Sequence, residues 1–129
     1  MDWIDEINKL KDGNIYDVAR LLIDGKEVDY TNQIVKRKVF ICWYVDQVFK
    51  GEWLIKENET GQKFGKPIYT IYTSMEYQFS LMLNGKKKAD AIKKAYVPKF
   101  IGYHYRWNNT AELIRFLKSK NYDITVRST

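Results

Sequence analysis

The feature that most constrains this chain is the apolar run from Val39 to Val45, which lies within a longer β-prone segment from Ile34 to Phe49. Apolar side chains fill both alternating sides of the run, with Val39, Ile41, Trp43 and Val45 on one side and Phe40, Cys42 and Tyr44 on the other. Such a pattern is typical of a central strand covered on both faces of a sheet. The run is also far shorter than the roughly 20 residues that a membrane span needs.

Helix start and stop signals predict four helices. Each begins at a residue whose side chain can cap the first turn, or follows a glycine that ends the previous helix. They are a first helix capped by Asp2, one from Thr73 to Leu83, one from Lys87 to Tyr96, and one from Asn109 to Asn121. The segment from Ile15 to Ile23 is ambiguous: a helical stripe through about Leu22 is favoured, and a hairpin turning at Asp24-Gly25 is the alternative.

The remaining segments predict strands and turns. Lys50-Gly51 is a plausible turn into a strand from Glu52 to Lys56, and Glu57 to Lys66 is the most loop-like stretch, the one expected to be mobile. Further strands are predicted at Ile68–Tyr72, Phe100–Trp107 and Tyr122–Arg127.

Together these elements predict one α+β domain spanning residues 1–129. Its sheet should be mainly antiparallel, with about four to six strands and helices packed on one side. The connection through the last helix is long enough for a parallel βαβ unit.

Charge points to an anionic partner. Lys and Arg total 22 against 16 Asp and Glu, a net charge of +6. Such a surplus favours nucleic acid, an acidic protein surface or a small anionic ligand. Most of the cations are lysines, which attract phosphate as point charges, whereas arginine forms the bidentate contacts that read bases.

Several classes of function find no support in the sequence. A single cysteine, Cys42, and a single histidine, His104, provide neither a disulfide nor a Cys/His metal site, and no cofactor is expected. No nucleophile elbow, phosphate loop or dinucleotide fingerprint occurs, so no catalytic residue is predicted. The acidic N-terminus lacks the apolar core of a signal peptide, which favours a cytoplasmic protein without membrane contact.

The strongest candidate site is a lysine cluster around the predicted third helix. Its members are Lys86, Lys87, Lys88, Lys93, Lys94 and Lys99. Such a face can contact several phosphates, although a merely solvated surface has the same composition. Two helices joined at Asn84-Gly85 also permit a helix-turn-helix interpretation, but the second helix lacks the Arg, Asn and Gln residues that read base edges.

The second candidate is the aromatic strand that ends at Trp107. Tyr103, Tyr105 and Trp107 alternate with His104 and Arg106. Aromatic side chains beside cations stack bases or other planar ligands, although packing of the three rings in the core would give the same alternation. If solvent reaches the side that carries His104 and Arg106, that side is the more interesting one. Trp53, Phe64 and Trp107 are the candidate exposed anchors for a protein partner.

Three functions follow, all of them non-catalytic. The first is nucleic-acid binding through the lysine-rich helical face. The second is protein binding, for instance by an inhibitor or a phage or mobile-element accessory protein that counters defence by blocking a host nuclease complex. The third is binding of a small anionic, nucleotide-like ligand in a pocket lined by tyrosines and lysines.

Overall fold

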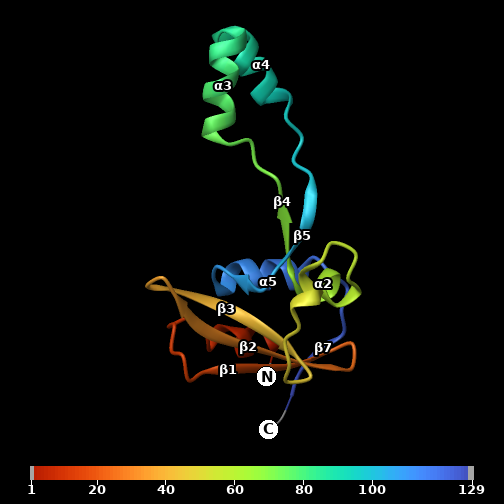
Figure 1. The fold of residues 1–129 in the computed structure, drawn as a ribbon. Helices are drawn as coiled ribbons and strands as arrows, with labels where there is room; N and C mark the ends of the chain where they lie inside the picture. Colours follow the sequence, from red (N-terminus) through yellow and green to blue (C-terminus); the bar gives the residue numbers. More distant parts are fainter. Residues whose placement is uncertain (1, 128–129) are drawn as a thin grey trace.

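The computed structural model describes residues 2–127 and has an α+β fold, as the sequence predicts. Its main sheet has five strands in the order β6-β3-β2-β1-β7, and every pair of neighbours is antiparallel. A separate ribbon, β4 with β5, rises from this body (Figure 1). The strands are β1 (Val18–Ile23), β2 (Lys26–Val35), β3 (Lys38–Val45), β4 (Lys66–Tyr69), β5 (Phe100–His104), β6 (Arg106–Trp107) and β7 (Ile124–Val126).

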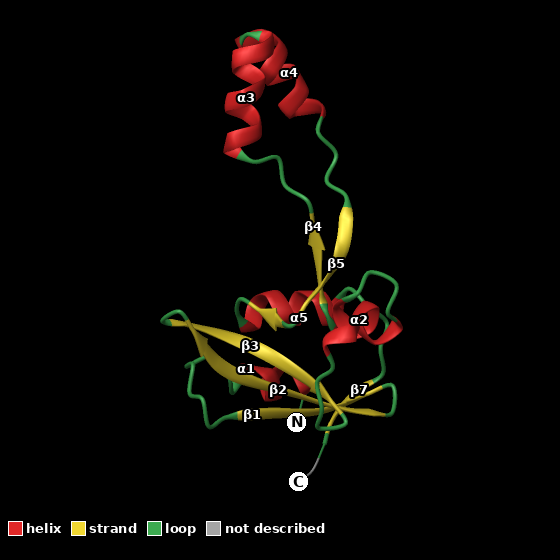
Figure 2. Cartoon of the chain, viewed as in Figure 1, coloured by secondary structure: helices red, strands yellow, loops and turns green. Residues whose placement is uncertain are grey.

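One face of the main sheet carries the core. Helices α1 (Trp3–Asn8) and α5 (Thr110–Lys118) contact each other and pack on this face, with α1 behind the sheet in Figure 2. The register sets Tyr30 of β2 between Ala19 of β1 and Trp43 of β3, and all three residues are fully buried. None of the helices among residues 2–127 is long and apolar enough to cross a membrane.

The opposite face of the sheet is open, which corrects the expectation that β3 is covered on both sides. Phe40 and Tyr44 point to this face and are only half-buried, as is Gln33 beside them on β2. The helices that pack on the sheet gather on the other face, so on this second side of the Val39–Val45 run Phe40 and Tyr44 are partly exposed and only Cys42 is buried.

The ambiguous N-terminal segment is a strand, so the favoured helix is wrong and the hairpin alternative is right. Asp24-Gly25 turns β1 into β2, and both residues have positive φ angles, 49° and 82°. The expected long strand from Ile34 to Phe49 is instead divided at Lys36-Arg37, the two-residue turn between β2 and β3. Pairing with neighbouring strands, which local periodicity does not report, decides both cases.

Residues 50–66 also differ from expectation. Lys50-Gly51 leads into a short 3₁₀ helix, η1 (Gly51–Leu54), rather than into a hairpin strand. The expected loop contains helix α2 (Glu59–Phe64), whose first turn is capped by the side chain of Asn58. Aromatic burial explains the difference, because η1 and α2 bring Trp53 and Phe64 against the indole of Trp43.

The helices predicted from capping signals are present. Thr73 caps α3 (Ser74–Asn84), Gly85 joins it to α4 (Lys86–Ala95), and Asn109 caps α5. The parallel βαβ unit is wrong, since β6 and β7 lie at opposite edges of the sheet with three strands between them. The predicted strand to Trp107 is broken by a bend at Tyr105.

An arm formed by residues 66–104 projects from the body. Its base is the β4–β5 ribbon and its end is the helical hairpin of α3 and α4, as Figures 1 and 2 show. Between ribbon and hairpin, the Thr70 hydroxyl accepts hydrogen bonds from the Tyr96 hydroxyl at 2.6 Å and from the Lys99 amide at 2.8 Å. The ring centroids of Tyr72 and Tyr96 lie 5.3 Å apart, and this contact joins the two segments that connect the ribbon to the hairpin.

Replacing Tyr30 with phenylalanine should stabilise the protein. The Tyr30 hydroxyl is fully buried and has no hydrogen-bond partner among the described residues, and burial raises its pKa far above the usual range. Removing a buried polar group that lacks a partner recovers a desolvation cost of about 1 kcal/mol. Urea denaturation of Tyr30→Phe beside the parent protein measures the gain; a loss of stability would show that the hydroxyl is satisfied.

Candidate functional site

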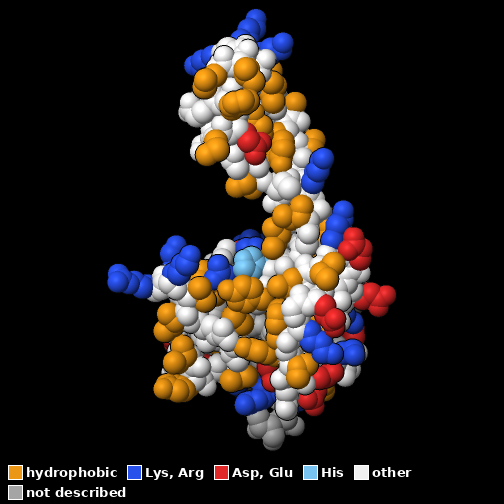
Figure 3. All heavy atoms as spheres, in the orientation of Figure 1, with side chains coloured by type: hydrophobic (Ala, Val, Ile, Leu, Met, Phe, Trp, Pro, Cys, Tyr) orange, Lys and Arg blue, Asp and Glu red, His pale blue; other side chains and the backbone are white. Residues whose placement is uncertain are grey.

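The predicted lysine cluster lies on the arm. Lys86, Lys87 and Lys88 form the first turn of α4, at the very end of the arm, where Figure 3 shows the basic side chains gathered. Lys94 lies further along α4, and all four side chains are exposed. The other two members are also exposed, with Lys93 over the Tyr77 ring at 5.0 Å and Lys99 beside the ribbon.

The arm is also the most apolar exposed part of the molecule. Nine of the fifteen large hydrophobic side chains that are exposed among residues 2–127 belong to it. They are Tyr69, Ile71, Met75, Phe79, Met82, Leu83, Ile92, Val97 and Ile101. Patches of this kind mark candidate binding surfaces, and the arm combines such apolar area with positive charge.

A second basic surface lies on the open face of the sheet. Arg106 of β6 stacks its guanidinium on the Phe40 ring of β3 at 4.0 Å and lies 5.3 Å from the Tyr105 ring. Lys36, from the β2–β3 turn, and Lys38, the first residue of β3, line the same hollow of about 440 Å³. We call Lys36, Lys38, Phe40, Tyr105 and Arg106 the basic hollow.

The basic hollow has cations but no counter-charge. Within residues 2–127, Lys36, Lys38 and Arg106 take part in none of the ion pairs. Among the described residues, Nη1 of Arg106 is buried without a hydrogen-bond partner, and Nδ1 of neighbouring His104 also lacks one. A guanidinium donor that lacks a protein acceptor is suited to an anion that supplies oxygen atoms.

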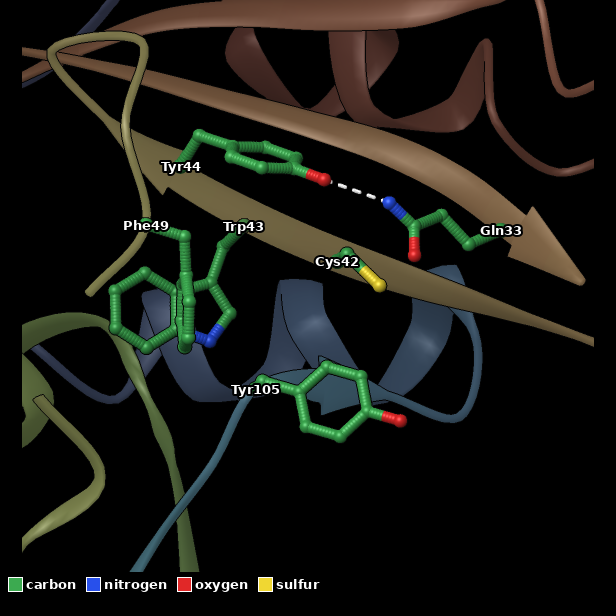
Figure 4. Close-up of a pocket in the computed structure, with 6 residues that line it drawn as sticks. All are labelled: Gln33, Cys42, Trp43, Tyr44, Phe49 and Tyr105. Atoms are coloured by element: carbon green, nitrogen blue, oxygen red, sulfur yellow. Dashed lines mark hydrogen bonds between the residues drawn. The ribbon is translucent and has the colours of Figure 1, made fainter. Parts of the chain in front are cut away.

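An aromatic pocket adjoins the basic hollow, with Tyr105 lining both. The pocket has a volume of about 210 Å³ and is drawn in Figure 4, where the Tyr105 ring lies across from Cys42 of β3. Its remaining lining is Gln33, Trp43, Tyr44 and Phe49. Gln33 donates to the Tyr44 hydroxyl at 2.6 Å, which fixes a polar edge on the open face. The space is smaller than the roughly 300–1,000 Å³ of drug-sized ligand sites and fits one flat ring system.

Local electrostatics keep the neutral forms of two groups near this surface. Burial, followed by the charges of Arg106 and Lys66, lowers the pKa of His104, so the imidazole is neutral at neutral pH. Burial raises the pKa of the Cys42 thiol to about 11 although Arg106 opposes the shift, so this cysteine is no nucleophile. Figure 3 shows His104, the chain's single histidine, in the recess where the arm meets the body.

The structure corrects most of the aromatic contacts that the sequence suggested. Trp53, Phe64, Tyr103 and Trp107 are buried, with at most 8% of their surface exposed, because they pack in or against the core. Only Tyr105 is half-buried, since the bend at its position turns it away from the core. Sequence inspection missed Phe40, Lys36 and Lys38; the apolar second side of β3 was the available signal for Phe40.

The structure therefore separates the predicted site residues into two groups. The six lysines lie on the arm, whereas His104, Tyr105 and Arg106 lie at its base beside the basic hollow. Comparison with known proteins found no match among protein families, curated proteins or solved structures.

The stability of the protein should fall as the pH drops from 7.5 to 5.5. The pKa of His104 is lowered in the folded state, so the unfolded chain binds the proton more readily. The contribution is complete above about 6.5, the ordinary histidine value, and is lost as the pH falls through the folded pKa.

Urea denaturation at the two pH values measures this effect. The carboxylates with lowered pKa values, Glu6, Asp24 and Glu112, titrate below this window. His104→Phe should therefore remove most of the pH dependence; a slope that persists in this variant would assign it to other groups.

Proposed function

We propose that this is a non-catalytic nucleic-acid-binding protein that holds a single strand on the open face of its sheet. The observation that carries the proposal is the basic hollow, in which Arg106 stacks on Phe40 beside Lys36 and Lys38 without a carboxylate partner. Proteins that bind single strands commonly combine cations that contact phosphates with neighbouring aromatic rings that stack on bases. The proposal also places the protein in the cytoplasm.

The arrangement of the two cavities supports a nucleotide as the bound unit. A phosphate in the basic hollow would meet Arg106, Lys36 and Lys38. A base in the aromatic pocket would lie against Tyr105. Gln33 and Tyr44 would meet the edge of that base. A flat aromatic pocket accepts an unpaired base, whereas the bases of a duplex are stacked on one another and cannot enter it.

The lysines of the arm contribute attraction at longer range. Residues 66–99 contain seven lysines and two acidic residues, so most of the chain's net charge lies on the arm. Such a concentration of charge speeds the approach of a polyanion and adds phosphate contacts beyond the hollow. It adds no base discrimination, because these contacts involve the backbone of the nucleic acid alone.

Fluorescence anisotropy with labelled single-stranded DNA, RNA and duplex DNA across a salt series tests the proposal. Single strands should bind more tightly than the duplex, and log affinity should fall linearly with log salt by about 0.7 per phosphate contact. Tryptophan fluorescence should also be quenched on binding, because Trp43 lines the aromatic pocket.

The outcomes separate the possible ligands. Equal affinity for single strands and duplex would leave the lysines of the arm as the binding surface and remove the base pocket from the proposal. Tight, salt-sensitive binding of a mononucleotide that a single strand does not exceed would identify a small ligand. Failure to bind any of these at low salt would overturn the proposal and favour a protein partner.

A further inference from the structure

The outer side of α3 is a stripe of large apolar side chains in solvent. Met75, Phe79, Met82 and Leu83 are spaced at i, i+4, i+7 and i+8, which places them on one face of the helix. Their side chains are 62 to 83% exposed. We call these four residues the α3 stripe.

The inner side of α3, which faces α4, has three polar groups, on Tyr77, Ser80 and Asn84, beside the half-buried Leu81. Ser80 is the buried residue of the helix, and Asn84 donates to its hydroxyl at 3.4 Å. The Tyr77 hydroxyl donates to the carboxylate of Asp90 on α4. A helix normally packs its apolar side inward and its polar side outward, so this inverted order indicates that another surface covers the stripe.

Charge distinguishes among the surfaces that would cover it. Ala89 is the buried residue of α4, so helical spacing puts Lys87, Ala91 and Lys94 on the far side of the hairpin from α3. The α3 stripe itself has no charged member. A partner with an acidic rim along the helix would find Lys87 and Lys94 turned away from it, whereas a second copy presents an equally neutral stripe.

We propose that the α3 stripe pairs with the α3 stripe of a second copy about a two-fold axis, with the two helices antiparallel. The four side chains of each copy then form the core of a four-helix arrangement, and both α4 helices lie outside it with their lysines in solvent. This pairing needs no ligand and does not rest on the proposed nucleic-acid site.

The antiparallel direction follows from the charges at the two ends of α3. A parallel pair would set the turns at Lys86–Lys88 side by side, where they repel. An antiparallel pair places Glu76, in the first turn of α3, near the lysine turn of the other copy. Because each arm projects from its body, the two bodies then lie at opposite ends and do not collide (Figure 1).

Sedimentation velocity on nuclease-treated protein over a range of concentrations tests the pairing. The parent protein should be an elongated dimer, and Phe79→Glu combined with Met82→Glu should be a monomer with an unchanged circular-dichroism spectrum, because both positions are exposed. Ala91→Glu, on the outer side of α4, is the matched control and should remain dimeric. A parent protein that is monomeric at every concentration, or a dimer that survives the double substitution, overturns the proposal.

Cross-linking tests which face of the hairpin forms the contact. Cys42 is buried, so a cysteine introduced at Gln78, beside the stripe, is the one accessible thiol. Under oxidation, Gln78→Cys should form a covalent dimer and Ala91→Cys should not. Equal cross-linking of the two variants contradicts the proposed geometry. Co-sedimentation of monomers with anionic phospholipid vesicles, lost in the Phe79→Glu, Met82→Glu variant, would assign the stripe to a lipid surface and overturn the pairing.

Discussion

Exchanging Lys36-Arg37 for Asn-Gly should weaken single-strand binding by about tenfold or more while making the protein more stable. The two residues form the turn between β2 and β3 with φ angles of 49° and 67°, a left-handed conformation that Asn-Gly adopts readily. Relief of this strain is expected to add about 1 kcal/mol to the free energy of unfolding. Loss of the two cations should lower the slope of log affinity against log salt by about 0.7 for each phosphate contact.

A second turn in the same sheet provides a matched control. Asp46-Gln47, between Val45 and Val48, has φ angles of 52° and 67° and no basic side chain. Asp46→Asn with Gln47→Gly should give a similar gain in stability without weakening the binding of single strands. Anisotropy titrations and urea denaturation on the three proteins measure both quantities. If the Lys36-Arg37 exchange leaves affinity unchanged, the basic hollow does not hold the phosphate.

Gly61→Ala should destabilise the protein by about 3 kcal/mol, the largest single effect on folding that we expect. A Cβ atom at Gly61 would lie 1.8 Å from the carbonyl oxygen of Trp53 and 2.8 Å from Cδ2 of Tyr103. The first of these neighbours is backbone and cannot rotate away, so α2 must move off η1. That movement would loosen the packing of Trp53 and Phe64 on Trp43.

The comparison that isolates this steric effect is Gly51→Ala. A Cβ atom at Gly51 meets nothing within 4 Å, and the residue has no positive φ angle. This variant should stay within about 0.5 kcal/mol of the parent protein in urea denaturation, as ordinary surface substitutions do. An equal loss in both variants would show that glycine is needed for backbone freedom here and not for close packing.

The sequence predicts elements that depend on local chemistry. Side chains that cap a helix are adjacent to the turn they stabilise, so Thr73 and Asn109 mark the starts of α3 and α5 without knowledge of the fold. Elements set by contacts between distant segments are not visible in this way. Helix α2 and strand β1 are such elements, because aromatic packing and strand pairing decide their conformation.

The candidate site likewise has one part that local sequence predicts and one part that it does not. The lysines from Lys86 to Lys94 are neighbours in sequence, and their position on a helical hairpin follows from the local signals at Gly85. The stack of Arg106 on Phe40 joins residues far apart in the chain, and it forms because β6 pairs with β3. No local pattern predicts that pairing, nor the pairing of β4 with β5 that lifts the hairpin from the body.

The sparse packing of the helical hairpin should make its backbone amides exchange with solvent faster than those of the body. Ser80 and Ala89 are the only residues of α3 and α4 that are buried, so little apolar area holds the hairpin closed. Short helices with few buried contacts open by local fluctuation, at a much lower free energy than the core of a domain. When no partner covers the hairpin, its amides should therefore exchange with solvent and its lysines should be cleaved by trypsin. The amides of β2 and β3 should remain protected. If the binding of a partner slows exchange in the hairpin alone, the surface that binds this partner lies on the arm.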